Sequence, residues 1–119
     1  MSRTRLKCRL LWKLCRKHGW GSPVPESVLI DLALGSSDQG EGATAVRELA
    51  DEPYIRYREG RGYSVKNDPD AQAQAACRLV STCEYLEIQV EPTLSRFEQA
   101  GGFDAYDERE IRAELADWG

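Results

Sequence analysis

The chain has 119 residues, of which 41% are hydrophobic and 30% are charged, and its formal net charge at pH 7 is −4. This length and composition favour one folded, soluble globule with a core of its own. No apolar run is long enough to cross a membrane, and the basic start is followed by only a short apolar stretch interrupted by charges. We therefore expect neither a transmembrane helix nor a signal peptide, and we expect a cytoplasmic location.

The charge is distributed unevenly along the chain. Residues 1–66 contain 12 Lys and Arg against 8 Asp and Glu, whereas residues 67–119 contain 4 against 12. The first 20 residues hold seven basic residues and no acidic one. Arginine outnumbers lysine 12 to 4, which indicates a GC-rich genome and a salt-adapted host, such as an archaeon or its virus or plasmid. The first half is therefore the part expected to bind a polyanion.

Hydrophobic periodicity predicts three helices in the first half. In residues 4–18, an apolar stripe faces one way and basic residues cover the opposite side. Residues 26–34 form a second short apolar helix, and the polar, glycine-punctuated residues 35–42 form a turn. Helical spacing resumes over residues 43–52 and stops at Pro53.

A β-hairpin is predicted for residues 54–65. Its tip holds Arg61 between two glycines, which supply the backbone freedom that a tight reversal needs. Alternation directs one set of side chains to the core and the other to solvent. The core-facing set is Ile55, Tyr57, Tyr63 and Val65, and the solvent-facing set is Arg56, Arg58 and Ser64.

The second half is predicted to be helical throughout. Residues 71–90 form one alanine-rich helix with Asn67 or Asp70 as its cap, and a short helix follows within residues 93–103. A last helix begins after Asp107, which is its predicted N-cap.

Two apolar strips in the second half predict a homodimer. The alanine-rich helix has a side of small residues that allows close helix packing. The last helix carries an apolar strip made of Ile111, Leu115 and Trp118. Either strip can instead fold back onto the first half of its own chain, and that alternative stays open.

The cysteines offer two interpretations. Cys15 and His18 are three residues apart, and Cys8 precedes Cys15 by seven, so these three side chains could share one side of a helix as metal ligands. No C-x-x-C pair occurs. We interpret all four cysteines, including Cys77 and Cys83, as free core residues, and we expect no metal and no cofactor.

The order helix, extended link, helix, turn, helix, hairpin resembles the winged helix-turn-helix family of DNA-binding domains. The residues that carry the resemblance are "VPESVLIDLAL", "TAVRELADEPYI" and the wing "YREGRGYSV". The resemblance covers about residues 4–67. It implies a mainly α fold with a small β-hairpin wing. We therefore expect a winged helix-turn-helix domain over residues 1–67, followed by an acidic helical extension, residues 68–119, that serves dimerisation.

The resemblance also implies the DNA-binding residues. In this family the third helix enters the major groove and the wing touches the backbone or the minor groove. Thr44 and Arg47 would then face bases, with Arg58 and Arg61 as the wing contacts. The turn would place Ser36, Ser37 and Gln39 near phosphates, and the basic first helix adds Arg5 and Arg9.

We predict a transcriptional regulator that binds double-stranded DNA as a homodimer. No nucleophile with a base and no P-loop is present, so we do not expect an enzyme. The alternative is a winged-helix module that binds another protein and not DNA. It is favoured by the acidic residues of the third helix, which are Glu41, Glu48, Asp51 and Glu52.

Overall fold

The computed structural model describes residues 2–17, 23–35 and 39–118. The protein is mainly helical and has one small antiparallel hairpin, as the sequence predicts. The first half contains α1 (Arg3–Lys17), α2 (Glu26–Leu34), α3 (Gln39–Leu49), β1 (Ile55–Arg58) and β2 (Gly62–Val65). The second half contains α4 (Pro69–Ser81), α5 (Glu87–Val90), the 3-10 helix η2 (Glu91–Thr93), α6 (Ser95–Gln99), α7 (Gly102–Ala105) and α8 (Glu108–Glu114).

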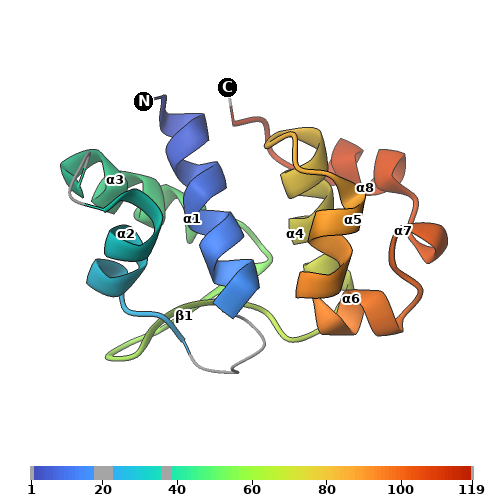
Figure 1. Ribbon diagram of the computed structural model, residues 1–119, viewed down its shortest axis with the longest axis horizontal. Helices are drawn as coiled ribbons and strands as arrows, with labels where there is room; N and C mark the ends of the chain where they lie inside the picture. Colours follow the sequence, from blue (N-terminus) through green and yellow to red (C-terminus); the bar gives the residue numbers. More distant parts are fainter. Residues whose placement is uncertain (1, 18–22, 36–38, 119) are drawn as a thin grey trace.

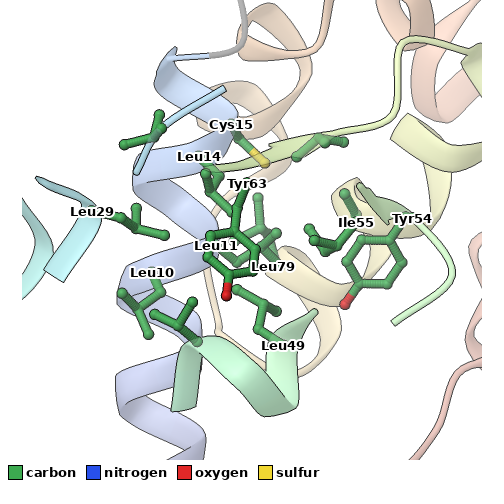
Figure 2. Packing of buried hydrophobic residues seen from close by; sticks show 14 of the residues in the cluster. Leu10, Leu11, Leu14, Cys15, Leu29, Leu49, Tyr54, Ile55, Tyr63 and Leu79 are labelled. Atoms are coloured by element: carbon green, nitrogen blue, oxygen red, sulfur yellow. The ribbon is translucent and has the colours of Figure 1, made fainter. Parts of the chain in front are cut away.

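Helix α1 stands between the two halves (Figure 1). It packs against α2 and α3 on one side and against α4 on the other. Its leucines are almost completely buried, and Figure 2 shows Leu10, Leu11 and Leu14 among side chains from both halves. Leu29 and Leu49 come from the first half and Leu79 from the second, and all belong to one hydrophobic cluster. The acidic extension therefore shares its core with the first half.

The hairpin is tied to the link that precedes α2. Ile55 pairs with Val65 and Tyr57 with Tyr63. On its other side Tyr63 exchanges two backbone hydrogen bonds with Val24, at 2.8 and 2.9 Å. The extended link predicted before the second helix is therefore joined to the hairpin by a one-residue β-bridge at Val24.

Helix α3 begins earlier than the sequence predicts. The expected turn over residues 35–42 is wrong, because α3 starts at Gln39 and includes two glycines. Glycine lowers helix propensity, which is why the pattern indicated a turn. At Gly42 a Cβ atom would lie 2.7 Å from Leu34 Cδ1 of α2, so glycine lets the two helices approach closely.

The long helix predicted over residues 71–90 is also interrupted. Helix α4 ends at Ser81, and Glu84 adopts a positive φ of 64° before α5 begins. The cap of α4 is Asp68, whose Oδ1 accepts a hydrogen bond from the Ala71 N–H at 2.8 Å, and not Asn67 or Asp70. The predicted N-cap of the last helix is confirmed: the Asp107 carboxylate accepts from the Arg109 N–H.

Both apolar strips assigned to a dimer interface pack within the chain. The small side of α4 is buried in the core, and α8 packs against α4. Ile111, Leu115 and Trp118 are partly buried against the same core. The strip of α4 therefore folds back onto the first half, as the alternative held, whereas the strip of the last helix packs mainly on α4 and stays partly exposed.

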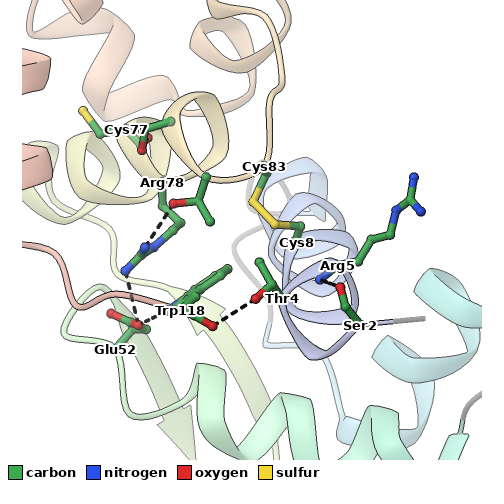
Figure 3. The surroundings of a disulfide bond; sticks show 11 residues. Ser2, Thr4, Arg5, Cys8, Glu52, Cys77, Arg78, Cys83 and Trp118 are labelled. Atoms are coloured by element: carbon green, nitrogen blue, oxygen red, sulfur yellow. Dashed lines mark hydrogen bonds and ion pairs between the residues drawn. A yellow bond between two sulfur atoms is a disulfide. The ribbon is translucent and has the colours of Figure 1, made fainter.

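The interpretation of four free cysteines is wrong for two of them. Cys8 of α1 forms a disulfide with Cys83, which follows α4 (Figure 3). The Cα atoms are 5.5 Å apart although 75 positions separate them in sequence, so spacing alone gave no sign of the pair. Cys15 and Cys77 are free and buried, as expected. Because Cys8 is in a disulfide, it does not offer the thiolate that a metal site would need.

No helix within the described part of the chain is both long and apolar enough to cross a membrane.

The Cys8–Cys83 disulfide is expected to stabilise the fold, because it closes a long loop in the unfolded chain. Reduction should lower the free energy of unfolding by up to about 4 kcal/mol. Urea unfolding with and without a thiol reductant measures this difference. The control is the double variant Cys8→Ser, Cys83→Ser, whose unfolding should not respond to reductant. An unchanged wild-type midpoint under reduction would contradict the prediction.

The two glycines of the hairpin tip should respond differently to alanine. Gly62 has φ +121°, and a Cβ there would collide with the Val24 carbonyl and lie 2.6 Å from the Pro25 nitrogen. Gly60 has φ +77° and open space around it. We expect Gly60→Ala to cost about 1 kcal/mol of unfolding free energy and Gly62→Ala at least twice that. Thermal or urea unfolding measures both changes in unfolding free energy. Equal losses for the two variants would argue against the close contact between Gly62 and Val24.

Candidate nucleic-acid interface

Helix α3 presents its predicted contact residues to solvent. Its buried face consists of Ala45, Val46 and Leu49, which pack into the core. Thr44 and Arg47 lie on the opposite side, and the Arg47 side chain is 71% exposed. Because these two residues are three positions apart, they project from the same face of the helix.

A groove of about 350 Å³ runs between the end of α3, the start of α2 and the hairpin. It brings together Arg47 and Arg61, two residues that the sequence assigned to separate contacts. Thr44 and Arg58 are also exposed, but they do not line this groove. The residues that line it are Pro25, Glu26, Arg47, Tyr57, Gly60, Arg61, Gly62 and Tyr63.

Glu26 is the acidic residue of this groove. It lies in the first turn of α2, and its Oε1 is 3.6 Å from Nε of Arg47. Burial raises the pKa of the neighbouring Tyr63 phenol, and the charge of Glu26 adds to that rise. Tyr63 therefore stays protonated at neutral pH.

Tyr57 is a groove residue that sequence reasoning missed. Alternation predicted that it faces the core, but its exposed fraction is 57%. Its ring lies 4.8 Å from the ring of Tyr63, centroid to centroid. Ile55, Val65 and Tyr63, the cross-strand partner of Tyr57, are buried as alternation predicts, whereas Tyr57 is not. An exposed tyrosine beside arginines is a surface on which a base or sugar can stack.

The basic side of α1 is partly paired with α3. Glu48 Oε1 lies 2.7 Å from Arg3 Nη1, and its Oε2 lies 3.2 Å from Lys7 Nζ. The hydrogen bond from Lys7 and the charges of both bases lower the pKa of Glu48. The sequence placed Glu48 on the outer side of the third helix; its side chain is 41% exposed there and is also paired with two bases of α1.

Arg5 and Arg9 stay exposed on α1 but do not line the groove. The charge of Arg9 acts on Tyr85 in the second half. The Gln39 side chain links α3 to α2, because its Nε2 donates to Asp31 Oδ1 and to the Gly35 carbonyl, both at 2.8 Å. Ser36 and Ser37 lie outside the described residues, as does His18 of the candidate metal set.

Within residues 2–17, 23–35 and 39–118, no group of three or more His, Cys, Asp and Glu side chains is arranged to hold a metal ion. Burial raises the pKa of Cys15 far above its ordinary value, so its thiol stays protonated. Burial also raises the pKa of Cys77, to about 12. Neither free cysteine has the character of a reactive thiolate.

The comparisons with known proteins give no match. No family model matches the chain, and neither the curated proteins nor the solved structures contain a significant relative. The function is therefore to be inferred from the side chains of this molecule.

Proposed function

We propose that this protein is a winged-helix transcriptional regulator that binds double-stranded DNA with α3 and the hairpin. The observation that carries the proposal is the groove in which Arg47 of α3 meets Arg61 of the hairpin tip. An exposed helix beside an arginine-tipped hairpin offers both a base-reading element and a backbone contact.

The arrangement of the first half supports a winged helix. Helices α1, α2 and α3 contact one another in pairs, and the hairpin follows α3. Val24 pairs with Tyr63 in an isolated antiparallel β-bridge. Each of these features suits a helix-turn-helix unit followed by a wing.

Acidic residues near α3 would repel DNA, but ion pairs within the chain reduce this repulsion. Of the four acidic residues near α3, Glu48 faces the bases of α1. Glu52 is buried and lies 3.6 Å from Nη2 of Arg78. Glu41 and Asp51 remain exposed, the first in the first turn of α3 and the second beyond its end. The middle of the exposed face thus carries Thr44 and Arg47.

The hairpin arginines are available to a polyanion. Neither Arg58 nor Arg61 forms an ion pair with another described residue. Both are exposed, and the guanidinium group matches the geometry of phosphate oxygens. We assign Arg58 and Arg61 to the DNA backbone or minor groove and Arg47 to a guanine in the major groove.

Selection from a pool of random duplexes tests the function and yields the preferred site. Wild-type protein should retard the selected duplex in an electrophoretic shift that weakens steeply with salt. Arg47→Ala should lower discrimination at one position by about 1 to 3 kcal/mol. Arg61→Ala should lower the affinity for the selected duplex and for random duplexes by the same factor. It should also reduce the slope of log affinity against log salt concentration by about one.

Arg56→Ala is the matched control, because Arg56 is exposed on β1 but does not line the groove. It should change affinity less than Arg61→Ala. If Arg47→Ala, like Arg61→Ala, lowered the affinity for all duplexes by the same factor, Arg47 would be a phosphate contact. The proposed reading of bases by Arg47 would then be wrong.

The alternative is a module that binds another protein and not DNA. It is favoured by two large apolar side chains that α2 leaves exposed, Val28 and Leu32, at 45% and 41%. They are four positions apart and therefore adjacent on the helix surface. Absence of retardation for any duplex, even in dilute salt, would support this alternative.

Homodimerisation remains part of the proposal, because a two-fold pair would place two reading helices on successive turns of the major groove. Because both strips pack within the chain, we look for the interface elsewhere in the second half. The exposed large apolar residues of the described second half are Leu86 and Ile88. Light scattering at micromolar concentration should give twice the chain mass, and a monomer mass in the salt of the host would refute the dimer.

The proposed site of action is the cytoplasm, where a transcriptional regulator of a prokaryotic genome meets DNA. Disulfides are rare in reducing cytosol but common in the intracellular proteins of some hyperthermophiles. The proposed cytoplasmic location therefore calls for a measurement of whether the Cys8–Cys83 disulfide is oxidised in the host cell.

A further inference from the structure

Glu26 stands out among the residues of the groove because its charge is opposed to DNA binding. It is the acidic member of a lining that contains two arginines. Its side chain is 34% exposed, and it is fixed to a rigid element, the first turn of α2. The start of that helix is anchored by the hydrogen bond from the Leu29 N–H to the Pro25 carbonyl at 2.9 Å.

Glu26 contacts Arg47 at the Nε side of its guanidinium group. The carboxylate lies 3.6 Å from Nε, on the inner edge of the guanidinium. The two terminal nitrogens, Nη1 and Nη2, are the pair that donates end-on to O6 and N7 of guanine. An ion pair on the Nε side attracts the guanidinium toward α2, and among the described residues Arg47 has no other ion pair.

We propose that Glu26 is a positioning residue that holds Arg47 for bidentate reading of guanine and disfavours its use as a phosphate contact. This inference rests on the proposed function. An Arg47 side chain without Glu26 would be free to swing toward the nearest phosphate, since 71% of its side-chain surface is exposed. The carboxylate also repels phosphates that approach the groove in a non-cognate register.

Glu26→Gln tests the inference, because it removes the charge and keeps the size of the side chain. The affinity for random duplex should rise severalfold, and the ratio of selected to random affinity should fall at least fivefold. Glu41→Gln is the matched control: Glu41 is an exposed acid in the first turn of α3 that does not line the groove. It should raise both affinities alike and leave the ratio unchanged.

A double-mutant cycle separates positioning from other roles. In an Arg47→Ala background, Glu26→Gln should no longer change the ratio, because the side chain that Glu26 positions is absent. An equal change in both backgrounds would mean that Glu26 contacts DNA itself and would overturn the inference. A lower melting temperature with an unchanged ratio would also overturn it, because Glu26 would then serve only the N-terminus of α2.

The two levels of the proposal fail in different ways. If wild-type protein retards no duplex in dilute salt, the proposed function fails, and the role of Glu26 fails with it. If wild-type protein binds a selected site and Glu26→Gln keeps the wild-type ratio, only the role of Glu26 is refuted.

Discussion

Burial of the leucine stripe of α1 is the interaction on which the rest of the structure depends. Leu6, Leu10, Leu11 and Leu14 are almost completely removed from solvent. Each contributes about 1.5 to 3 kcal/mol through burial, so together they match the net stability of an ordinary small domain. Because α1 packs on α2 and α3 and also on α4, the same helix positions the groove and anchors the second half.

A second set of contacts joins the two halves around the C-terminal end. The Arg78 side chain of α4 is 4% exposed and pairs with Glu52, which follows α3. The Trp118 ring lies 4.2 Å from the Arg78 guanidinium carbon, and its Nε1 donates to the same Glu52 carboxylate (Figure 3). Thr4 of α1 donates to the Trp118 carbonyl at 2.9 Å. A buried ion pair adds little net stability, but it is costly to break, so it favours one arrangement of the halves.

Internal pairing also changes the charge that the protein presents. Glu48 pairs with Arg3 and Lys7 at the surface, and Glu52 pairs with Arg78 in the interior, so part of the formal charge is balanced by local partners. The exposed charged residues of α3 and the hairpin are Glu41, Arg47, Arg56, Arg58, Glu59 and Arg61, and Glu26 lies beside Arg47. The electrostatic character of the candidate interface therefore depends on which acids are paired with bases and which are not.

The sequence by itself determined the identity of most elements near the groove. The apolar spacing of residues 4–18 and 26–34 and the glycines of the hairpin are local signals, and α1, α2 and the hairpin lie where they indicate. Arg47 and Arg61 were found as exposed arginines because residue type and periodicity suffice for that. The start of α3 was missed because Gly42 serves packing against Leu34 and not a turn.

Only the tertiary structure decided which distant residues meet. Periodicity reports which side of a helix is apolar, but not which segment covers it, so the strips of α4 and α8 could equally have faced a second copy. The Cys8–Cys83 bond, the pairing of Glu48 with α1 and the exposure of Tyr57 depend on contacts between segments far apart in sequence. The same holds for Glu26 and Arg47, because α2 and α3 must pack before a carboxylate at one helix start can orient an arginine near the end of the other.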